Sequence, residues 1–409
     1  MSTRDTLRMM FKASDGANIA IAYDHANTSA TAQQVKALMD AIIANKEIFS
    51  QQPQTALGAE MLCRERMTID IGGPGPAPAD PQMSLDDGEE HGQDLAAYWG
   101  GVMMPHGVIA FAPCNANYVG LAENGGGSFE VKHAVNQPDP KYLGAVLCPP
   151  QHENIVVFIP CNADQMLTVY GEGEYNYMGP DHNSGDFAFF GGVYLEYWYE
   201  PDPVNEPGEG WDEGRVVMVP FNASAIAAFD QGAYEFEVGA DHGEGQMAFS
   251  GGVRIDKSKA LLVPYDSEYI GIYDLATDEY TRGPAHVISS NAFMGGVRHE
   301  DFVYLIPYNS PRIGIYNITT NQYTDGPEHD CGDAAFVGGA VMGGYLVMSP
   351  YSATHVGVME ISSRRFIKGP ENAVKEAYTG VIPDLMGNSA TFVPYNATHI
   401  GRFTIMPGG

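Results

Sequence analysis

The sequence is poor in basic residues and in long apolar segments. Its 409 residues include 21 Lys and Arg against 51 Asp and Glu, which gives a formal net charge of −30. Such an acidic chain repels phosphate backbones and anionic bilayers, so nucleic acid and membrane insertion are not expected. No apolar run approaches the 18 residues of a membrane span, and the first residues lack the apolar core of a signal peptide.

Cysteine motifs are also missing. The five cysteines show no CxxC pair and no spacing of zinc ligands, so we expect reduced thiols in a protein made in the cytoplasm. A protein without an export signal can still reach the outside when a particle carries it. The 48 Gly, 27 Pro, 23 Tyr and 18 Phe favour short strands and tight turns over helices.

Residues 1–71 predict a small ββαβ domain. Apolar residues alternate with polar ones at 7–11 and 19–23, with Asp-Gly in the turn between them. Helical spacing of apolar residues follows at about 31–46, and a last alternating segment covers about 59–71.

The segment TLRMMFKASDGANIAIAYDHANTSATAQQVKALMDAIIANKEIF lies within this domain. It resembles a family of short uncharacterised proteins of Gram-positive bacteria, which implies no activity. GGPGPAPADPQ (72–82) then has the composition of a linker. The rest of the chain, 83–409, forms the second predicted domain.

A repeat dominates this second domain. A proline, an aromatic residue or cysteine, and a small polar residue recur every 43–47 residues, with one interval of 60. The polar residue is expected to bond its own backbone in an Asx-turn. The seven prolines are Pro113, Pro160, Pro220, Pro264, Pro307, Pro350 and Pro394.

Each repeat divides into four short strands, as in AFMGGV, VYLIPY, IGIYNI and QYTDG of 292–326. Four strands in about 43 residues are typical of a propeller blade. The Gly pair belongs on the innermost strand, where seven blades converge. We therefore predict a mainly β fold, a seven-bladed β-propeller behind the small α+β domain.

The last repeat stops after three strands. Its fourth is predicted near the front of the domain, because 87–102 aligns without gaps on 325–340. An outer strand at about 82–87 would close the ring and remove exposed sheet edges.

The segments YDLATDEYTRGP and YNITTNQYTDGP resemble part of the kelch repeat, over about 82–406. The Gly pair lies on a different strand from that of kelch proteins, and Tyr or Phe replaces the kelch Trp. The resemblance implies a kelch-like propeller, and no catalytic residue follows from it.

A histidine recurs after the outer strand of most repeats, with Asn372 in one place and a shifted His133 in another. One hypothesis is a ring of imidazoles that binds metal or senses pH. The other, favoured by the repetition itself, is a side chain that hydrogen-bonds the loop between blades. The five histidines in register are His91, His182, His242, His286 and His329.

The third repeat carries an inserted loop at 194–214, between its first and second strands, that combines aromatic and acidic side chains. Aromatic faces stack on sugar rings while carboxylates accept from hydroxyls, so a glycan or protein contact is one interpretation. Packing on a neighbouring subunit or over a sheet edge is another. The candidate ligand-binding residues are Tyr194, Tyr197, Trp198, Tyr199, Asp202, Trp211 and Asp212.

A small domain, a linker and a rigid head suggest an anchor, a tether and a binding platform. We expect a non-enzymatic adhesion protein on a particle, above all a bacteriophage virion protein such as a tail fibre, spike or capsid decoration. Its expected partners are the assembly, through the N-terminal domain, and a host-surface glycan or protein, through the propeller. We expect the chain to be one copy in a homo-oligomer.

Two other functions stay open from the sequence. One is a polysaccharide-active enzyme on the propeller, and the other is an intracellular kelch-like scaffold for protein partners. No cofactor is expected, although the acidic insertion has the oxygen ligands that Ca²⁺ prefers without the spacing of an EF-hand.

Overall fold

The computed structural model describes residues 5–12, 18–25, 80–125, 127–149, 155–171, 173–199, 211–288, 290–384 and 387–406. The chain divides into two compact units, one of Met1–Pro81 with Pro407–Gly409 and one of Gln82–Met406. Within the described ranges, no helix has the length and apolar character needed to cross a membrane.

The described part of the first unit is a β-hairpin. Strands β1 (Asp5–Lys12) and β2 (Asn18–His25) pair in antiparallel fashion, with Leu7 opposite Tyr23 and Met9 opposite Ile21. This confirms the first two predicted strands and their register. The predicted helix at 31–46, the predicted strand at 59–71 and the linker up to residue 79 lie outside the described residues.

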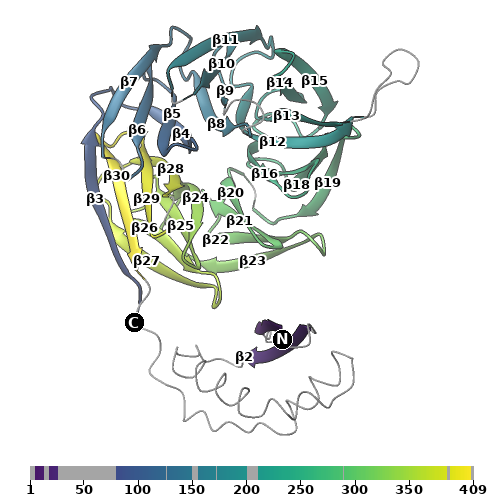
Figure 1. Cartoon of the computed structure of the whole chain (residues 1–409), viewed down its shortest axis with the longest axis vertical. Helices are drawn as coiled ribbons and strands as arrows, with labels where there is room; N and C mark the ends of the chain where they lie inside the picture. The colour runs from purple at the N-terminus through teal and green to yellow at the C-terminus, as the bar shows by residue number, and fades with distance from the viewer. Residues whose placement is uncertain are drawn as a thin grey trace, which may run out of the picture. The chain divides into compact units, whose positions relative to one another are not determined.

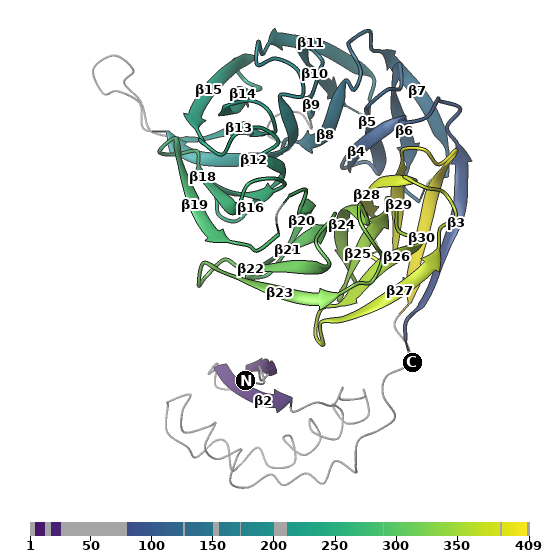
Figure 2. The same ribbon diagram turned by 180° about the vertical axis from the view of Figure 1, so that it is seen from behind.

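The second unit is a seven-bladed β-propeller (Figure 1), as the repeat predicted. Seven sheets of four antiparallel strands stand around a common axis, and Figure 2 shows the same ring from behind. In six of the blades the strands follow chain order from the axis outward.

We number the blades along the chain, starting with the blade that begins at β4. Blade 1 is β4 (Tyr98–Met103), β5 (Val108–Pro113), β6 (Tyr118–Glu123) and β7 (Phe129–Ala134). Blade 2 is β8 (Tyr142–Leu147), β9 (Val156–Pro160), β10 (Gln165–Tyr170) and β11 (Tyr175–Asp181). Blade 3 is β12 (Phe189–Tyr199), β13 (Trp211–Pro220), β14 (Ala225–Asp230) and β15 (Glu235–Asp241).

The remaining blades follow the same plan. Blade 4 is β16 (Phe249–Arg254), β17 (Lys259–Pro264), β18 (Tyr269–Asp274) and β19 (Glu279–Ala285). Blade 5 is β20 (Phe293–His299), β21 (Phe302–Pro307), β22 (Arg312–Asn317) and β23 (Gln322–Glu328). Blade 6 is β24 (Phe336–Met342), β25 (Tyr345–Pro350), β26 (His355–Glu360) and β27 (Arg365–Glu371).

Blade 7 joins the two ends of the ring. Its strands are β28 (Tyr378–Pro383), β29 (Ser389–Pro394), β30 (His399–Met406) and β3 (Gln82–Glu90). Leu85 of β3 lies opposite Phe403 of β30, and the hydroxyls of Ser84 and Thr404 are 2.8 Å apart. The predicted closure by a strand from the front of the domain is therefore confirmed.

Seven glycines line the axis where the innermost strands converge. A Cβ atom placed on Gly191 would lie 3.2 Å from the Cα of Gly251, and Gly191 also has a left-handed φ of 73°. Larger residues would force the blades apart, which explains the Gly at the start of the motif in six blades. In blade 7 Thr379 holds that first place and Gly380 follows it. The seven positions are Gly100, Gly144, Gly191, Gly251, Gly295, Gly338 and Gly380.

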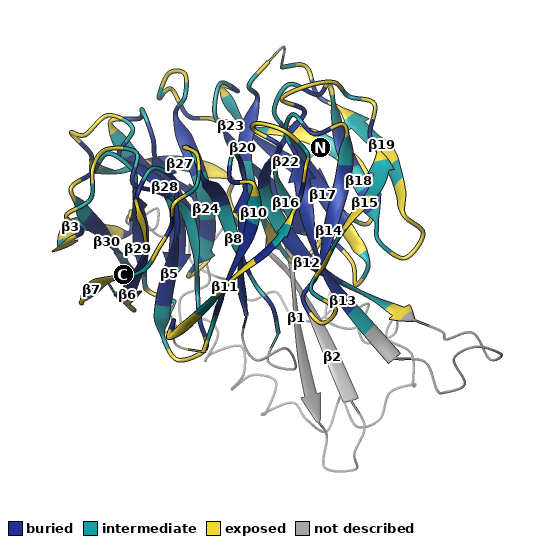
Figure 3. Ribbon diagram, turned by 90° about the horizontal axis from the view of Figure 1, so that it is seen from above, coloured by how far each residue is buried: buried dark blue, intermediate teal, exposed yellow. Residues whose placement is uncertain are grey.

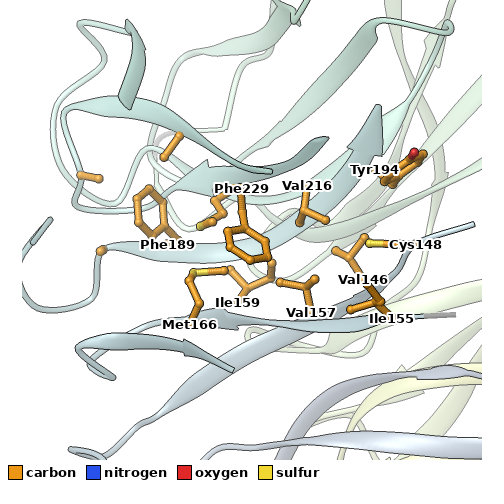
Figure 4. Close-up of a cluster of buried hydrophobic side chains, with 14 residues drawn as sticks. Val146, Cys148, Ile155, Val157, Ile159, Met166, Phe189, Tyr194, Val216 and Phe229 are labelled. Carbon is orange, nitrogen blue, oxygen red and sulfur yellow. The ribbon is translucent and has the colours of Figure 1, made fainter. Parts of the chain in front are cut away.

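The hydrophobic core lies between neighbouring blades. Figure 3 shows buried residues along the strands and exposed residues at the turns. Between blades 2 and 3, Val157 and Ile159 of β9 pack with Val216 of β13 and Phe229 of β14 (Figure 4). Each such side chain contributes about 1.5–3 kcal/mol of burial free energy, so the ring is a rigid support for its turns.

Candidate functional site

The five recurring histidines are buried and hydrogen-bonded to backbone through both ring nitrogens. Each Nδ1 accepts from the amide two residues later, at 3.1–3.3 Å. Each Nε2 lies 2.6–2.9 Å from a carbonyl oxygen in the turn between the second and third strands. The pairs are His91 with Ala397, His182 with Ala163, His242 with Ala223, His286 with Ser267 and His329 with Ser310.

These contacts require a neutral imidazole with its proton on Nε2. Burial lowers the pKa of His91, His286 and His329, which favours that form. Asn372 reproduces the pattern where histidine is missing. Its Oδ1 accepts from the Val374 amide, and its Nδ2 donates to the Val374 carbonyl and, at 3.5 Å, to the Ala353 carbonyl. An architectural role thus accounts for the whole set.

Metal ligation has no support in the described part of the chain. There, no group of three or more His, Cys, Asp or Glu side chains is arranged to hold an ion. The shifted His133 also has a structural role, since its Nε2 lies 2.7 Å from the carbonyl oxygen of Gly173 in the next blade.

Five of the seven polar residues after the prolines bond the next blade, and the Asx-turn prediction is wrong for these five. Their side-chain oxygens accept from amides 2.7–3.2 Å away, on residues with φ of 49–58°. The bonds tie adjacent blades together at the turns. The pairs are Asn162 with Phe187, Asn222 with Met247, Asp266 with Asn291, Asn309 with Ala334 and Asn396 with Ala96.

The residues next to those prolines, five aromatic and two cysteine, form a ring that packs with Trp99 and Phe190. Trp99 lies across it, with ring centroids 5.3 Å from Phe190, 5.9 Å from Tyr351 and 5.2 Å from Tyr395. Cys114 occupies the equivalent place in blade 1, where burial raises its thiol pKa to about 12. A thiol with such a raised pKa is a poor nucleophile, so we assign Cys114 and the ring a structural packing role.

The predicted loop of blade 3 begins and ends as an extension of strands β12 and β13. Strands β12 and β13 are 11 and 10 residues long, against 6 each for β16 and β17 of the next blade. They pair without interruption from Val193 opposite Val217 to Tyr199 opposite Trp211. This extended hairpin leaves the propeller on the face opposite the histidines, because it joins the first strand to the second.

Polar contacts hold the base of the hairpin. Glu196 binds Arg254 of blade 4 at 2.9 Å, and its amide donates to the Lys257 carbonyl at 3.0 Å. On the other strand, the buried Arg215 contacts Glu213 at 2.8 Å, and the Tyr197 hydroxyl donates to Glu213 at 2.9 Å. The hairpin therefore leaves the ring in a defined direction.

The structure divides the predicted ligand-binding residues by position. Tyr194 is buried against Val216 and Cys148, so it belongs to the core (Figure 4). Tyr197 is half-buried, and burial raises its pKa to about 12. Trp198 is 60% exposed at a strand position. Asp202 and the side chains of Tyr199, Trp211 and Asp212 lie outside the described part.

A second feature at the same side of the propeller was missed from the sequence. Tyr170, Tyr175 and Tyr177 of blade 2 and Tyr234 of blade 3 line a groove of about 410 Å³. The turns that carry Tyr175 and Tyr234 join third strands to fourth strands, so they share a face with the extended hairpin. Comparison of equivalent positions between repeats is the signal that could have found them.

Comparisons with known proteins assign the first unit and the fold of the second. Residues 4–69 match a family described as protein of unknown function (DUF2922). This agrees with the predicted resemblance of the N-terminal module, and it assigns no activity. No curated protein sequence matches the chain.

Solved structures similar to the propeller come from several proteins. A streptogramin B lyase shares 13% identity with a TM-score of 0.64, covering 79% of this chain and 98% of its own. Virginiamycin B lyase from Staphylococcus aureus shares 16% identity with a TM-score of 0.60, covering 80% of this chain and 100% of its own.

The extracellular domain of a putative one-component system of B. thetaiotaomicron shares 9% identity with a TM-score of 0.54. That match covers 81% of this chain and 43% of its own. At such identities the likeness shows the propeller fold alone. The kelch resemblance stays a prediction.

Proposed function

We propose that this chain is a non-enzymatic recognition protein carried on the surface of a particle. The propeller is its binding head and the N-terminal module is its attachment. A bacteriophage virion protein, in the form of a tail fibre, spike or capsid decoration, is the specific proposal.

The extended hairpin of blade 3 is the observation that carries the proposal. It breaks the sevenfold repeat, it is held at its base by Glu196 and Arg215, and it exposes Trp198. An exposed tryptophan on an ordered strand is typical of recognition surfaces, where aromatic residues supply much of the binding energy. The rigid ring below keeps the ordering cost of binding low.

The repeated polar residues support a binding role indirectly, because their own role is structural. The histidines and the Asn turns form the hydrogen bonds that hold blades and junctions together, so their recurrence has a structural explanation. Features specific to one or two blades then mark the functional surface. The net charge of −30 favours a neutral or cationic target over an anionic one.

A truncated hairpin tests the proposal. Residues 198–212 are replaced by Asn-Gly between Tyr197 and Glu213, which face each other across the two strands. This keeps the Tyr197–Glu213 and Glu196–Arg254 contacts, so we expect a folded propeller that no longer binds host cells or a glycan array. The control is Leu95→Ala, an exposed side chain in another loop. Unchanged binding by the truncated variant contradicts the proposal.

The particle is tested separately. Particles purified on a density gradient from the source culture are analysed by mass spectrometry, with and without proteolytic removal of the N-terminal module. We expect peptides of the propeller in the particle fraction only while the module is attached. A chain found in the free protein fraction alone would overturn the particle assignment.

A further inference from the structure

The tyrosine groove between blades 2 and 3 is built by strand register. Tyr175 lies opposite Tyr170, and Tyr177 lies opposite Thr168, so these side chains share one face of the blade 2 sheet. Thr168 then reaches blade 3, because its hydroxyl lies 3.0 Å from that of Tyr234. The groove is thus assembled from two blades.

The rings in the groove are exposed to different degrees. Tyr175 and Tyr177 are 63% and 57% exposed, and Tyr170 packs edge-on against Tyr177 with centroids 5.3 Å apart. Tyr170 and Tyr234 pack partly on the hydrophobic core between the blades. Two fixed rings at the base and two exposed rings at the rim leave aromatic surface open to a ligand.

Blades 3, 4 and 5 have polar residues where blade 2 has tyrosine. The strand pairing places Asp230, Glu235 and Glu237 of blade 3 at the positions of Tyr170, Tyr175 and Tyr177. The corresponding residues are Asp274, Glu279 and Thr281 in blade 4, and Asn317, Gln322 and Thr324 in blade 5. A blade therefore folds without aromatic residues at these positions.

Tyr234 departs from the repeat as well. It has a φ of 61°, a conformation in which a bulky side chain is uncommon and Asn or Asp is favoured. The equivalent turn residues are Asp278 of blade 4, with a φ of 50°, and Asn321 of blade 5, with a φ of 51°. Blade 6 has Arg364 there, with a φ of 56°. This bulky residue has an unfavourable backbone conformation at the place where its ring completes the groove lined by the other three tyrosines.

We propose that this groove binds an uncharged oligosaccharide, an inference that rests on the proposed recognition function. Tyrosine rings offer flat faces for the C–H surface of a pyranose, and their hydroxyls exchange hydrogen bonds with sugar hydroxyls. A volume of about 410 Å³ admits more than one sugar unit. Glu235 and Glu237, both exposed on the neighbouring strand, disfavour anionic sugars.

The test is calorimetric titration of the full chain with defined probes. Cellohexaose, chitohexaose, mannohexaose and maltohexaose are the neutral probes, hexagalacturonate is the anionic one, and choline tests a purely cationic ligand. We expect at least one neutral hexasaccharide to bind at millimolar concentration or below, and hexagalacturonate not to bind. Binding of choline alone, or of no neutral probe, overturns the sugar assignment.

Variants locate the site. Tyr177→Ala and Tyr175→Ala are expected to weaken binding of the neutral probe about tenfold each, while Tyr177→Phe keeps it within about threefold because the ring remains. Tyr118→Ala removes a tyrosine of blade 1 that is 40% exposed and should leave binding unchanged.

Failure of this inference is distinguishable from failure of the proposed function. If the alanine variants bind the probe as the wild type does, the groove is not the site. If they bind cells normally while hairpin truncation abolishes cell binding, the recognition function stands without the groove.

Discussion

Substitution of one of the five recurring histidines measures how much these side chains stabilise the propeller. His329 is 2% exposed, its Nε2 contacts the Ser310 carbonyl at 2.8 Å, and its Nδ1 accepts from the Cys331 amide at 3.1 Å. His329→Ala loses two hydrogen bonds of about 1 kcal/mol each and leaves two buried backbone groups unsatisfied. We expect the free energy of unfolding to fall by about 2–4 kcal/mol.

The chain supplies the matched control. His329→Asn copies Asn372, which bonds the same kind of loop in another blade, and should recover about half of the loss. Chemical denaturation followed by tryptophan fluorescence measures both variants. A loss below 0.5 kcal/mol for the alanine variant, or a wild-type midpoint that shifts with EDTA or zinc, would refute the architectural role.

The same histidines predict a pH dependence. Burial lowers the pKa of His91, His286 and His329 in the folded state, so the unfolded chain binds protons more readily. Their stabilisation is present above the unfolded pKa of about 6.5 and is lost as the pH falls through the lower folded values. His329→Asn should therefore reduce the slope of stability against pH in the acid range. An unchanged slope contradicts this.

Three further predictions concern the axis, the closure and the hairpin. Gly191→Ala should destabilise the propeller by about 1–2 kcal/mol more than Gly243→Ala, because both have left-handed φ but only Gly191 has a neighbouring backbone within 4 Å. Ser84→Cys with Thr404→Cys should form a disulfide and raise the thermal midpoint, since the two hydroxyls are 2.8 Å apart. Trp198→Ala should change stability by less than about 0.5 kcal/mol and still weaken cell binding, because the side chain is 60% exposed. Equal losses of stability for the two glycine variants would contradict the first prediction. Absence of the cross-link would contradict the second, and intact cell binding by Trp198→Ala would contradict the third.

The ring could be predicted because its period is visible in the sequence. Each turn proline and each Gly pair marks a fixed place in a blade, and the gapless alignment of 87–102 on 325–340 indicated the closing strand. A repeated unit that cannot bury its own face must stack on copies of itself, so recognition of the period leads directly to the fold.

The extended hairpin was harder to predict. Tyr194, Glu196 and Trp198 alternate with other residues as in a strand, yet the prolines and acidic residues that follow suggested a loop. The pairing of Trp198 with Asp212 depends on two segments meeting across the insertion. Strand register of this kind is set by tertiary contacts, here those of Arg215 and Arg254 at its base.

The contacts between blades could not be read from one repeat. Asn222 bonds an amide 25 residues later, on a residue that the turn sequence does not mark. The tyrosine groove has the same origin, because Tyr234 meets Tyr170 only when blade 3 packs on blade 2. The groove tyrosines break the repeat and could have been found on that ground, whereas Asn222 belongs to the repeat and carries no such mark.

Hydrogen exchange measured by mass spectrometry tests most directly whether the rim of blades 2 and 3 is the recognition surface. The full chain is compared with and without the neutral hexasaccharide that binds most tightly. We expect slowed exchange in the turn between β10 and β11, in the turn between β14 and β15 and along β12 and β13. Protection confined to the turns that carry Phe221 and Tyr265, on the opposite face, would contradict the account.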